Sequence, residues 1–387
     1  MLTETEIKSI INEYKKPKKS VFRSFYVDKI LSFIDRKEVL VLKGIRRCGK
    51  STIMKQVISR LKGKSVYVNL DDYRFLEHKS IELLEKILKI YLNDKKLYLF
   101  LDEIQTVPNF ETWLRTHYDK ETNVKFIISG SNSTLMSKTL ATLMTGRSLT
   151  YEITPLSYKE FHDFSKGGLS EYLEYGGFPE VVLETDLEGK REILTNYFNT
   201  IIEKDIVLKY GVQQDKQLKE LMKYILSNPG IRISANKLSK QLGLSINTVK
   251  SYLSLAEEVY LLFEVPFFSY SAKTKFIASR VSKYYCIDNG FTKILTTRLE
   301  KSKAYENSVA LFFFKERENL YYWKGANEVD FVINDLAINV VSSKQIPKRE
   351  FMGLEEIKKE FKTVKETKMI SEERSEKSMG ITEFLLK

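Results

Sequence analysis

The stretch "EVLVLKGIRRCGKSTIMKQVISRL", residues 38–61, decides the fold of the first part of the chain. "EVLVL" is apolar and rich in valine, which predicts a buried strand, and "IMKQVISRL" has helical spacing. Between them, residues 44–51 match the phosphate-loop pattern G-x-x-x-x-G-K-[ST]. Its glycines let backbone N–H groups converge on phosphate oxygens, and the start of the helix adds a positive dipole end. We therefore expect a nucleotide-binding α/β fold.

Each position of this loop has an expected role. Lys50 should reach the β- and γ-phosphates, the Ser51 hydroxyl should bind Mg²⁺, and Thr52 should support the first helical turn. Arg46 and Arg47 either contact phosphates or face solvent, and the sequence leaves both interpretations open. Cys48 is interpreted as a small filler in preference to a redox switch. The candidate nucleotide-binding residues of the loop are Gly44, Ile45, Arg46, Arg47, Cys48, Gly49, Lys50, Ser51 and Thr52.

Two further strands with polar ends follow the loop. "KLYLFLDEIQ", residues 96–105, predicts a buried parallel strand that ends in acids, at the sheet edge where α/β proteins bind ligands. Asp102 should hold the Mg²⁺ shell and Glu103 should polarise the attacking water. "VKFIISGSNS", residues 124–133, predicts another buried strand. Ser131 or Asn132 at its end could sense the γ-phosphate, and a simple turn is the alternative.

These motifs resemble those of the AAA+ ATPases. More narrowly, the chain resembles an archaeal and bacterial family that joins such an ATPase to a winged helix and a restriction-endonuclease-like domain. The matching segments are "GIRRCGKST", "LFLDEIQ", "ISGSNS", "MTGRSLTYEITPLSYKEF", "YGGFPEVV", "ENSVALFFF" and "EVDFVI". The resemblance implies that Arg147 is an arginine finger acting on a neighbouring copy, with a salt bridge as the equal alternative. It also places Pro179 of "GGFP" near adenine, with an ordinary helix break as the alternative.

The resemblance also organises the chain. It implies a P-loop AAA+ core with a parallel sheet at 1–155, a helical lid at 156–212 and a winged helix-turn-helix at 213–285. A degenerate PD-(D/E)xK nuclease-like α/β domain should follow at 286–387. For its end we expect an edge strand at "GITEFLL", residues 380–386.

The proposed winged helix predicts a duplex-DNA contact. Three helical patterns with short turns, and Gly243 between the last two, have helix-turn-helix spacing. On the third helix, Asn247, Lys250 and Ser251 should face out, whereas Val249, Leu253 and Leu255 should turn inward. A following hairpin should be a basic wing on phosphate. The alternative is that the module packs within the chain or binds protein. The expected wing residues are Lys273, Lys275, Arg280 and Lys283.

The nuclease-like segment lacks two expected groups. "EVDFVINDLAINVVSS", residues 328–343, ends one strand in Asp330, but the next strand has Asn339 and Val341 where an acid and a lysine are expected. Asn339 lacks the charge to bind a hard cation well, and Lys344 has the wrong parity for the site. We therefore predict no nuclease activity. Glu306, Glu328 and Asp330 would then be remnants of the fold, which serves binding or assembly.

Composition limits the functional classes. The formal charge of +12 favours a polyanionic partner such as nucleic acid, although genome composition alone gives Lys-rich chains too. Two cysteines and three histidines argue against a disulfide framework and structural zinc. No apolar run is long enough for a membrane span, and the polar, acidic N-terminus is not a signal peptide, so we expect a cytoplasmic protein.

The hypothesis is a Mg²⁺-dependent ATPase that binds ATP, self-associates as a homo-oligomer, and couples its nucleotide cycle to DNA. The alternative is a slow nucleotide-gated switch or scaffold that binds protein partners in regulation or genome defence.

Overall fold

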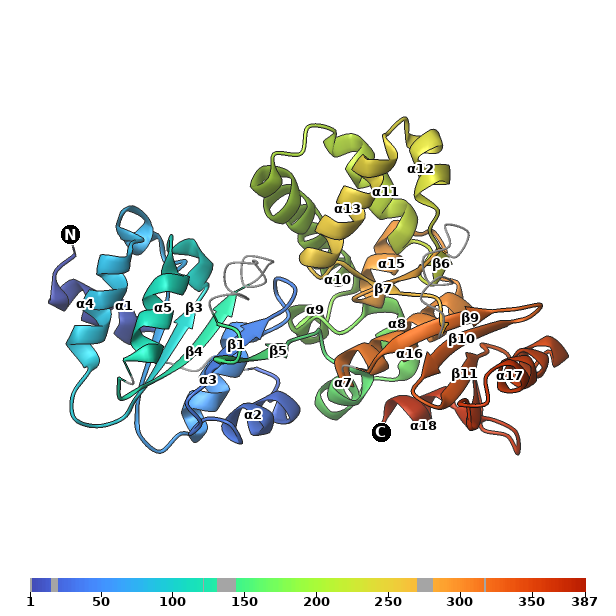
Figure 1. Cartoon of the computed structure of the whole chain (residues 1–387), viewed down its shortest axis with the longest axis horizontal. Coiled ribbons are helices and arrows are strands. Elements are labelled where there is room, and N and C mark those ends of the chain that lie inside the picture. Colours follow the sequence, from blue (N-terminus) through green and yellow to red (C-terminus); the bar gives the residue numbers. More distant parts are fainter. Residues whose placement is uncertain (1, 15–19, 121, 131–143, 270–280, 317) are drawn as a thin grey trace. The chain divides into compact units, whose positions relative to one another are not determined.

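The chain forms two compact units, residues Met1–Ile153 and Thr154–Lys387, in the computed structural model (Figure 1). The structure describes residues 2–14, 20–120, 122–130, 144–269, 281–316 and 318–387. No helix in these ranges is long and apolar enough to cross a membrane. The unit boundary lies close to the expected one at 155, and the finer division of the second unit stays a prediction.

The first unit is a parallel sheet with helices on its faces. The sheet has five strands in the order β2-β3-β4-β1-β5. Its elements are α1 (Glu4–Glu13), α2 (Ser24–Leu31), β1 (Val39–Lys43), α3 (Lys50–Arg60), β2 (Lys64–Asn69), η1 (Tyr73–His78), α4 (Ile81–Tyr91), β3 (Leu97–Asp102), η2 (Ile104–Thr106), α5 (Phe110–Asp119), β4 (Val124–Gly130) and β5 (Ser148–Glu152). The expected α/β architecture of this unit is therefore confirmed.

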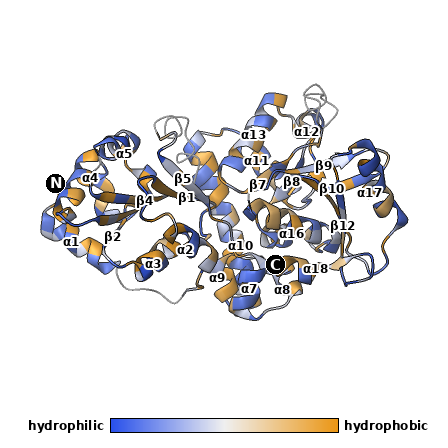
Figure 2. Ribbon diagram, turned by 60° about the horizontal axis from the view of Figure 1, so that its bottom comes forward, coloured by the Kyte–Doolittle hydropathy of each residue, from blue (hydrophilic) through white to orange (hydrophobic). Residues whose placement is uncertain are grey.

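The strands are apolar because both faces of the sheet are covered. Every residue of β3 is buried, as expected for a central parallel strand. Alternate strand residues pack on helices α1, α4 and α5 on one face, and α3 contacts β4. Figure 2 shows hydrophobic and hydrophilic residues mixed along α3 and α4, as expected for helices with one face on a sheet and the other in solvent.

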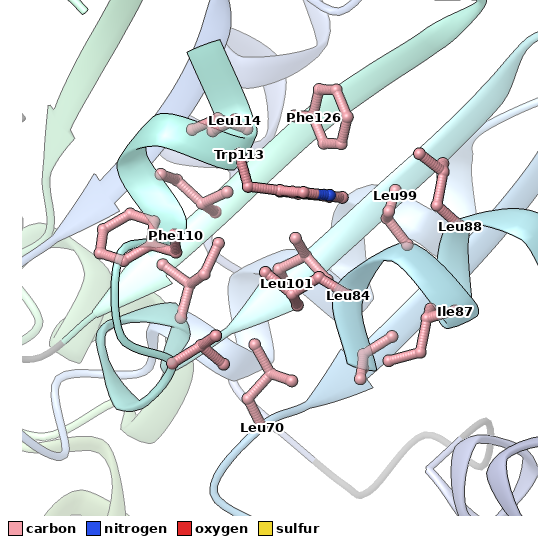
Figure 3. Close-up of a cluster of buried hydrophobic side chains, with 14 of the residues drawn as sticks. Leu70, Leu84, Ile87, Leu88, Leu99, Leu101, Phe110, Trp113, Leu114 and Phe126 are labelled. Atoms are coloured by element: carbon pink, nitrogen blue, oxygen red, sulfur yellow. The ribbon is translucent and has the colours of Figure 1, made fainter. Parts of the chain in front are cut away.

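The core between the sheet and helices α4 and α5 is built around Trp113 (Figure 3). Its indole meets the ring of Phe126 edge-on, with ring centroids 5.4 Å apart. Leu84 and Leu88 of α4 approach the same cluster from the other helix. This packing fixes the two strands, β3 and β4, whose carboxyl ends carry polar residues.

The second unit contains two further sheets. Its elements are α7 (Tyr158–Ser165), α8 (Leu169–Tyr175), α9 (Pro179–Leu183), α10 (Leu187–Thr200), the π-helix η4 (Ile201–Leu208), α11 (Asp215–Leu226), β6 (Ile231–Arg232), α12 (Ala235–Leu242), α13 (Ile246–Glu258), β7 (Leu262–Val265), β8 (Lys283–Cys286), α15 (Asn289–Leu295), α16 (Lys301–Glu316), β9 (Leu320–Lys324), β10 (Glu328–Ile333), β11 (Leu336–Val340), α17 (Lys348–Glu360), β12 (Glu366–Ser371), β13 (Met379–Gly380) and α18 (Ile381–Leu385). One sheet is β6-β8-β7, and the other is β13-β12-β11-β10-β9.

The larger of these sheets is mixed. Strands β9, β10 and β11 pair antiparallel, whereas β12 and β13 continue the sheet in parallel. The expected edge strand at 380–386 is wrong, because residues Ile381–Leu385 form helix α18. The buried Ile381, Phe384 and Leu385 have i, i+3, i+4 spacing, which suits one face of a helix and not a strand.

Candidate functional site

The loop after β1 is shaped by two glycines. Gly49 has φ 102° and immediately precedes α3, so the backbone turns into the helix start at Lys50. Gly44 has φ 150°, and a Cβ there would lie 2.0 Å from the carbonyl oxygen of Ile153. Only glycine fits this close approach. Arg47 also has positive φ, at 70°. The loop is therefore held in one curved conformation between β1 and α3.

The Lys50 ammonium lies inside this curve. It is buried and donates to the carbonyl oxygens of Gly44 at 2.9 Å and Ile45 at 3.1 Å. Behind the loop, the buried Arg23 donates to the carbonyl oxygen of Cys48 at 3.1 Å. Cys48 is fully buried, and burial raises the pKa of its thiol, which agrees with the predicted role as a filler. The basic run that contains Arg23 indicates a solvated linker or a phosphate contact, so the sequence did not predict this buried contact with the loop.

Asp102 sits at the carboxyl end of β3 and is almost fully buried. Ser129 donates to one carboxylate oxygen and Tyr67 to the other, and the Ser51 hydroxyl lies close to this carboxylate. Burial, together with the negative charge of Glu103, raises the pKa of Asp102. The parallel register pairs Leu101 with Ile128, so the residues that follow them, Asp102 and Ser129, come together at the strand ends. The structure thus places the two predicted Mg²⁺ ligands, Ser51 and Asp102, close together. Tyr67, which was not predicted, belongs to the same site.

Glu103 follows in a left-handed conformation, with φ 56°. Its N–H donates to the Ser129 hydroxyl at 3.3 Å, and its carboxylate accepts from the Gln105 amide. Ser129 therefore organises both acids. The predicted sensors, Ser131 and Asn132, lie outside the described residues.

Arg147 lies near the amino end of β1, at the end of the sheet opposite to the phosphate loop. Its carbonyl oxygen accepts from the N–H of Val39, the first residue of β1, whereas the phosphate loop follows the last residue of that strand. The guanidinium pairs with Asp119 at 3.2 Å and is about one-third exposed. Within one chain, Arg147 therefore forms a salt bridge, which is the alternative to its role as an arginine finger. An action on a neighbouring copy stays a prediction.

The "GGFP" glycines contact a buried acid. A Cβ at Gly176 would lie 1.7 Å from a carboxylate oxygen of Asp288. The N–H groups of Gly177 and Gly290 donate to the two oxygens of Asp288 at 2.7 and 2.8 Å. Burial raises the pKa of Asp288 to about 7. Pro179 is the first residue of α9, a common helix start. These contacts account for both glycines structurally, and a Pro179 contact with adenine stays a prediction.

Asp288→Asn should destabilise the protein by about 1–3 kcal/mol at pH 5, below the pKa of this carboxyl, where the native group carries no buried charge that the variant would remove. An amide has one acceptor oxygen, so one buried N–H would lose its partner. Asp186→Asn is the matched control, because Asp186 caps α10 in an exposed position and Asn caps a helix about equally well. Denaturant unfolding of both variants measures the difference. Equal stabilities for the two variants would contradict the role of Asp288.

The exposed side of α13 carries the predicted DNA-contacting residues. Asn247, Lys250 and Ser251 are exposed, and Val249 and Leu253 are buried, as the helical spacing predicts. Leu255, expected to turn inward, is partly buried. Gly243 ends α12 with φ 64°. The orientation of this helix is therefore confirmed, whereas its contact with DNA stays a prediction. Lys273, Lys275 and Arg280 lie outside the described residues.

Lys283 is not a wing residue on the surface, so that expectation is wrong. Its side chain is 3% exposed, and its ammonium contacts Glu306 at 2.8 Å, Glu328 at 2.7 Å and Asp330 at 3.5 Å. Burial opposes the charged form, but the carboxylates, Glu306 foremost, raise the pKa of Lys283 well above its usual range. Burial and the Glu306 charge raise the pKa of Asp330. We call Lys283, Glu306, Glu328 and Asp330 the lysine–carboxylate cluster.

Asn339 has a structural role beside this cluster. Its oxygen accepts from the N–H of Asp330 at 3.0 Å, and its amide donates to the carbonyl oxygens of Glu328 and Glu350 at 3.3 and 2.9 Å. Lys344 pairs with Glu373 on the surface, and its predicted orientation away from the cluster is confirmed. Within the described ranges, no three His, Cys, Asp or Glu side chains are arranged to hold a metal ion.

Known proteins resemble both units. Residues 36–162 match the AAA domain, and residues 166–302 match a domain of unknown function. The uncharacterized protein MJ1544 of Methanocaldococcus jannaschii is 34% identical over 324 residues, which cover 76% of this chain and 72% of that protein. An uncharacterized protein of Haemophilus influenzae is 30% identical over 301 residues, 71% of this chain and 74% of that protein.

The fold is similar to that of a solved ATPase structure. The Walker-type ATPase PABY2304 of Pyrococcus abyssi superposes with a TM-score of 0.52 at 15% identity, covering 72% of this chain and 98% of that one. With the AAA-domain match, this likeness supports a P-loop ATPase fold for the chain.

Proposed function

We propose a Mg²⁺-dependent ATPase function for this chain, which belongs to the AAA-domain protein family of the uncharacterized protein MJ1544 from Methanocaldococcus jannaschii. The observation that carries the proposal is the meeting of Ser51 with the buried Asp102 beside a phosphate loop that encloses Lys50. A hydroxyl and a carboxylate are the oxygen ligands that Mg²⁺ takes at nucleotide sites, with waters completing the shell. The donor set therefore fits a Mg²⁺–nucleotide complex.

The residues divide the reaction between them. The loop N–H groups and Lys50 would bind and orient the phosphates, with the ammonium leaving its carbonyl partners for the β- and γ-oxygens. Ser51 and Asp102 would hold Mg²⁺, which neutralises charge on the phosphates. Glu103 would accept a proton from the water that attacks the γ-phosphorus, and the bond to the bridging oxygen of ADP would break. Ser129 positions Glu103 by accepting its N–H.

The second part of the proposal is that nucleotide turnover is coupled to duplex DNA. In favour of it are the order α11-β6-α12-α13-β7-β8, typical of a winged helix, the exposed side of α13 and the charge of +12. The burial of Lys283 removes one predicted phosphate contact. That observation favours the alternative, a nucleotide-gated switch that binds protein partners through this module.

Measurement of ATP turnover with and without duplex DNA, at two salt concentrations, tests both parts. We expect DNA to stimulate turnover and the stimulation to fall as salt rises. Lys250→Ala should make the slope of log affinity for DNA against log salt concentration shallower, by the contribution of roughly one phosphate contact. Lys359→Ala, an exposed lysine of α17, is the matched control. Turnover indifferent to DNA would reject the coupling, and no turnover under any condition would reject the ATPase.

We extend the proposal to a homo-oligomer in which Arg147 of one copy completes the site of the next. The position of Arg147, at the sheet edge away from its own phosphate loop, suits an action on a second copy. Sedimentation with and without nucleotide tests this part. A protein that stays monomeric in every nucleotide state would remove Arg147 from the site.

A further inference from the structure

The lysine–carboxylate cluster joins three elements of the second unit. Lys283 begins β8, Glu306 lies on α16, and Glu328 and Asp330 are alternate residues of β10, so both point to the same face of that strand. The carboxylate side chains are 19%, 30% and 15% exposed, whereas that of Lys283 is 3% exposed. The ammonium is therefore the innermost charge, and the carboxylates surround it.

The contacts of the carboxylates hold them around this centre. Tyr285, also on β8, donates to Glu306 at 2.6 Å, and the N–H of Val340 donates to Asp330 at 2.9 Å. Asn339 fixes the β10 backbone on either side of residue 329 through Glu328 and Asp330. The carboxylates thus converge because the backbone and their other partners place them there. Without a cation at the centre, their like charges would be costly at partial burial.

Lys283 supplies that cation from within the chain. Its ammonium lies 2.7–3.5 Å from one oxygen of each carboxylate, so it occupies the point toward which all three converge. A lysine ammonium is a compact point charge with three donors, and it can hold three oxygens without any other ligand. With the ammonium in place these oxygens are not arranged to hold a metal ion, but without it they could draw in by about half an ångström to about an ångström, to the distances of a divalent cation.

We propose that Lys283 takes the place of a divalent cation in this cluster, so that the native chain binds no metal there and a chain without this ammonium does. The ammonium then also fixes β8, a strand of the smaller sheet, to helix α16 and to β10, a strand of the larger sheet. A cluster filled in this way has no metal to polarise a phosphodiester, which is a second reason, besides Asn339 and Val341, to expect no DNA cleavage. The inference does not depend on the proposed ATPase function.

The test compares Lys283→Met with the native chain in Mn²⁺ titrations followed by electron paramagnetic resonance, without nucleotide. We expect the full-length K283M variant to bind one Mn²⁺ at least roughly tenfold more tightly than any site of the native chain. The added Asp330→Asn change should abolish that binding. Lys344→Met is the matched control, because Lys344 is an exposed lysine that pairs with Glu373. It removes the same charge and should behave as the native chain does.

Thermal unfolding gives the second readout, because a metal that binds only the folded chain stabilises it. Mn²⁺ should raise the Tm of K283M by more than it raises that of the native chain, and a variant that is unfolded alone should fold when Mn²⁺ is added. Three results would overturn the proposal. They are a folded K283M that binds no Mn²⁺, a K283M that stays unfolded in saturating Mn²⁺, and a native chain that binds Mn²⁺ equally tightly through Asp330.

Discussion

Glu103→Gln should leave ATP binding intact and lower turnover by about 10²–10⁴-fold, the usual contribution of a general base. The change keeps the size of the side chain and its acceptor for the Gln105 amide. It also keeps the backbone bond from residue 103 to Ser129. The loop, Lys50 and Asp102 are untouched, so affinity for ATP should change little. Steady-state turnover and binding of a fluorescent nucleotide separate the two effects.

Glu77→Gln is the control for this variant, since Glu77 is an exposed acid of η1 in the same unit. It removes one negative charge away from the loop and should not alter turnover. Native turnover in E103Q would show that another group activates the water. A joint loss of binding and turnover would instead mean that Glu103 shapes the loop.

The first unit was largely predictable, because its signals are local. A buried strand, a glycine-bounded loop and a helix that begins at Lys50 follow one another within a single stretch of sequence. The order of the strands is not local, and it decides which polar ends meet. β4 lies between β1 and β3, so Ser129 at its end reaches Asp102. The sequence pattern favoured Ser131 and Asn132, because the register between β3 and β4 is not encoded in the local sequence.

The second unit was less predictable, because its chemistry depends on partners far apart in the chain. The pattern around Lys283 indicates an exposed hairpin lysine, and its partners lie 23 to 47 residues further on. Gly176 and Gly177 looked like a lid motif, and their partner Asp288 is 111 residues from Gly177. No periodicity reports such a contact. A lysine or a glycine pair has the same local signal whether it serves a ligand or a buried carboxylate.

Gly44→Ala should abolish nucleotide binding and destabilise the first unit. The added Cβ would lie 2.0 Å from the Ile153 carbonyl oxygen, and backbone atoms on both sides cannot move cheaply. The N–H of Ile153 donates to the carbonyl oxygen of Lys43 at 2.7 Å, next to the pairing of β1 with β5. A movement of Ile153 that relieves the clash would break this hydrogen bond, and a movement of residue 44 would shift the loop. Overlap of this kind costs about 1–3 kcal/mol, and the φ of 150° adds strain for alanine.

Gly146→Ala separates the clash from a general effect of removing a glycine. Gly146 has φ 70°, but a Cβ there meets no atom within 4 Å. Its variant should therefore lose only about 1–2 kcal/mol from the left-handed conformation and keep its affinity for ATP. Thermal unfolding and nucleotide titration of the two variants measure the contrast. If G44A bound ATP as tightly as G146A does, the contact between the loop and Ile153 would not control the loop's shape, and the enclosure of Lys50 would need another cause.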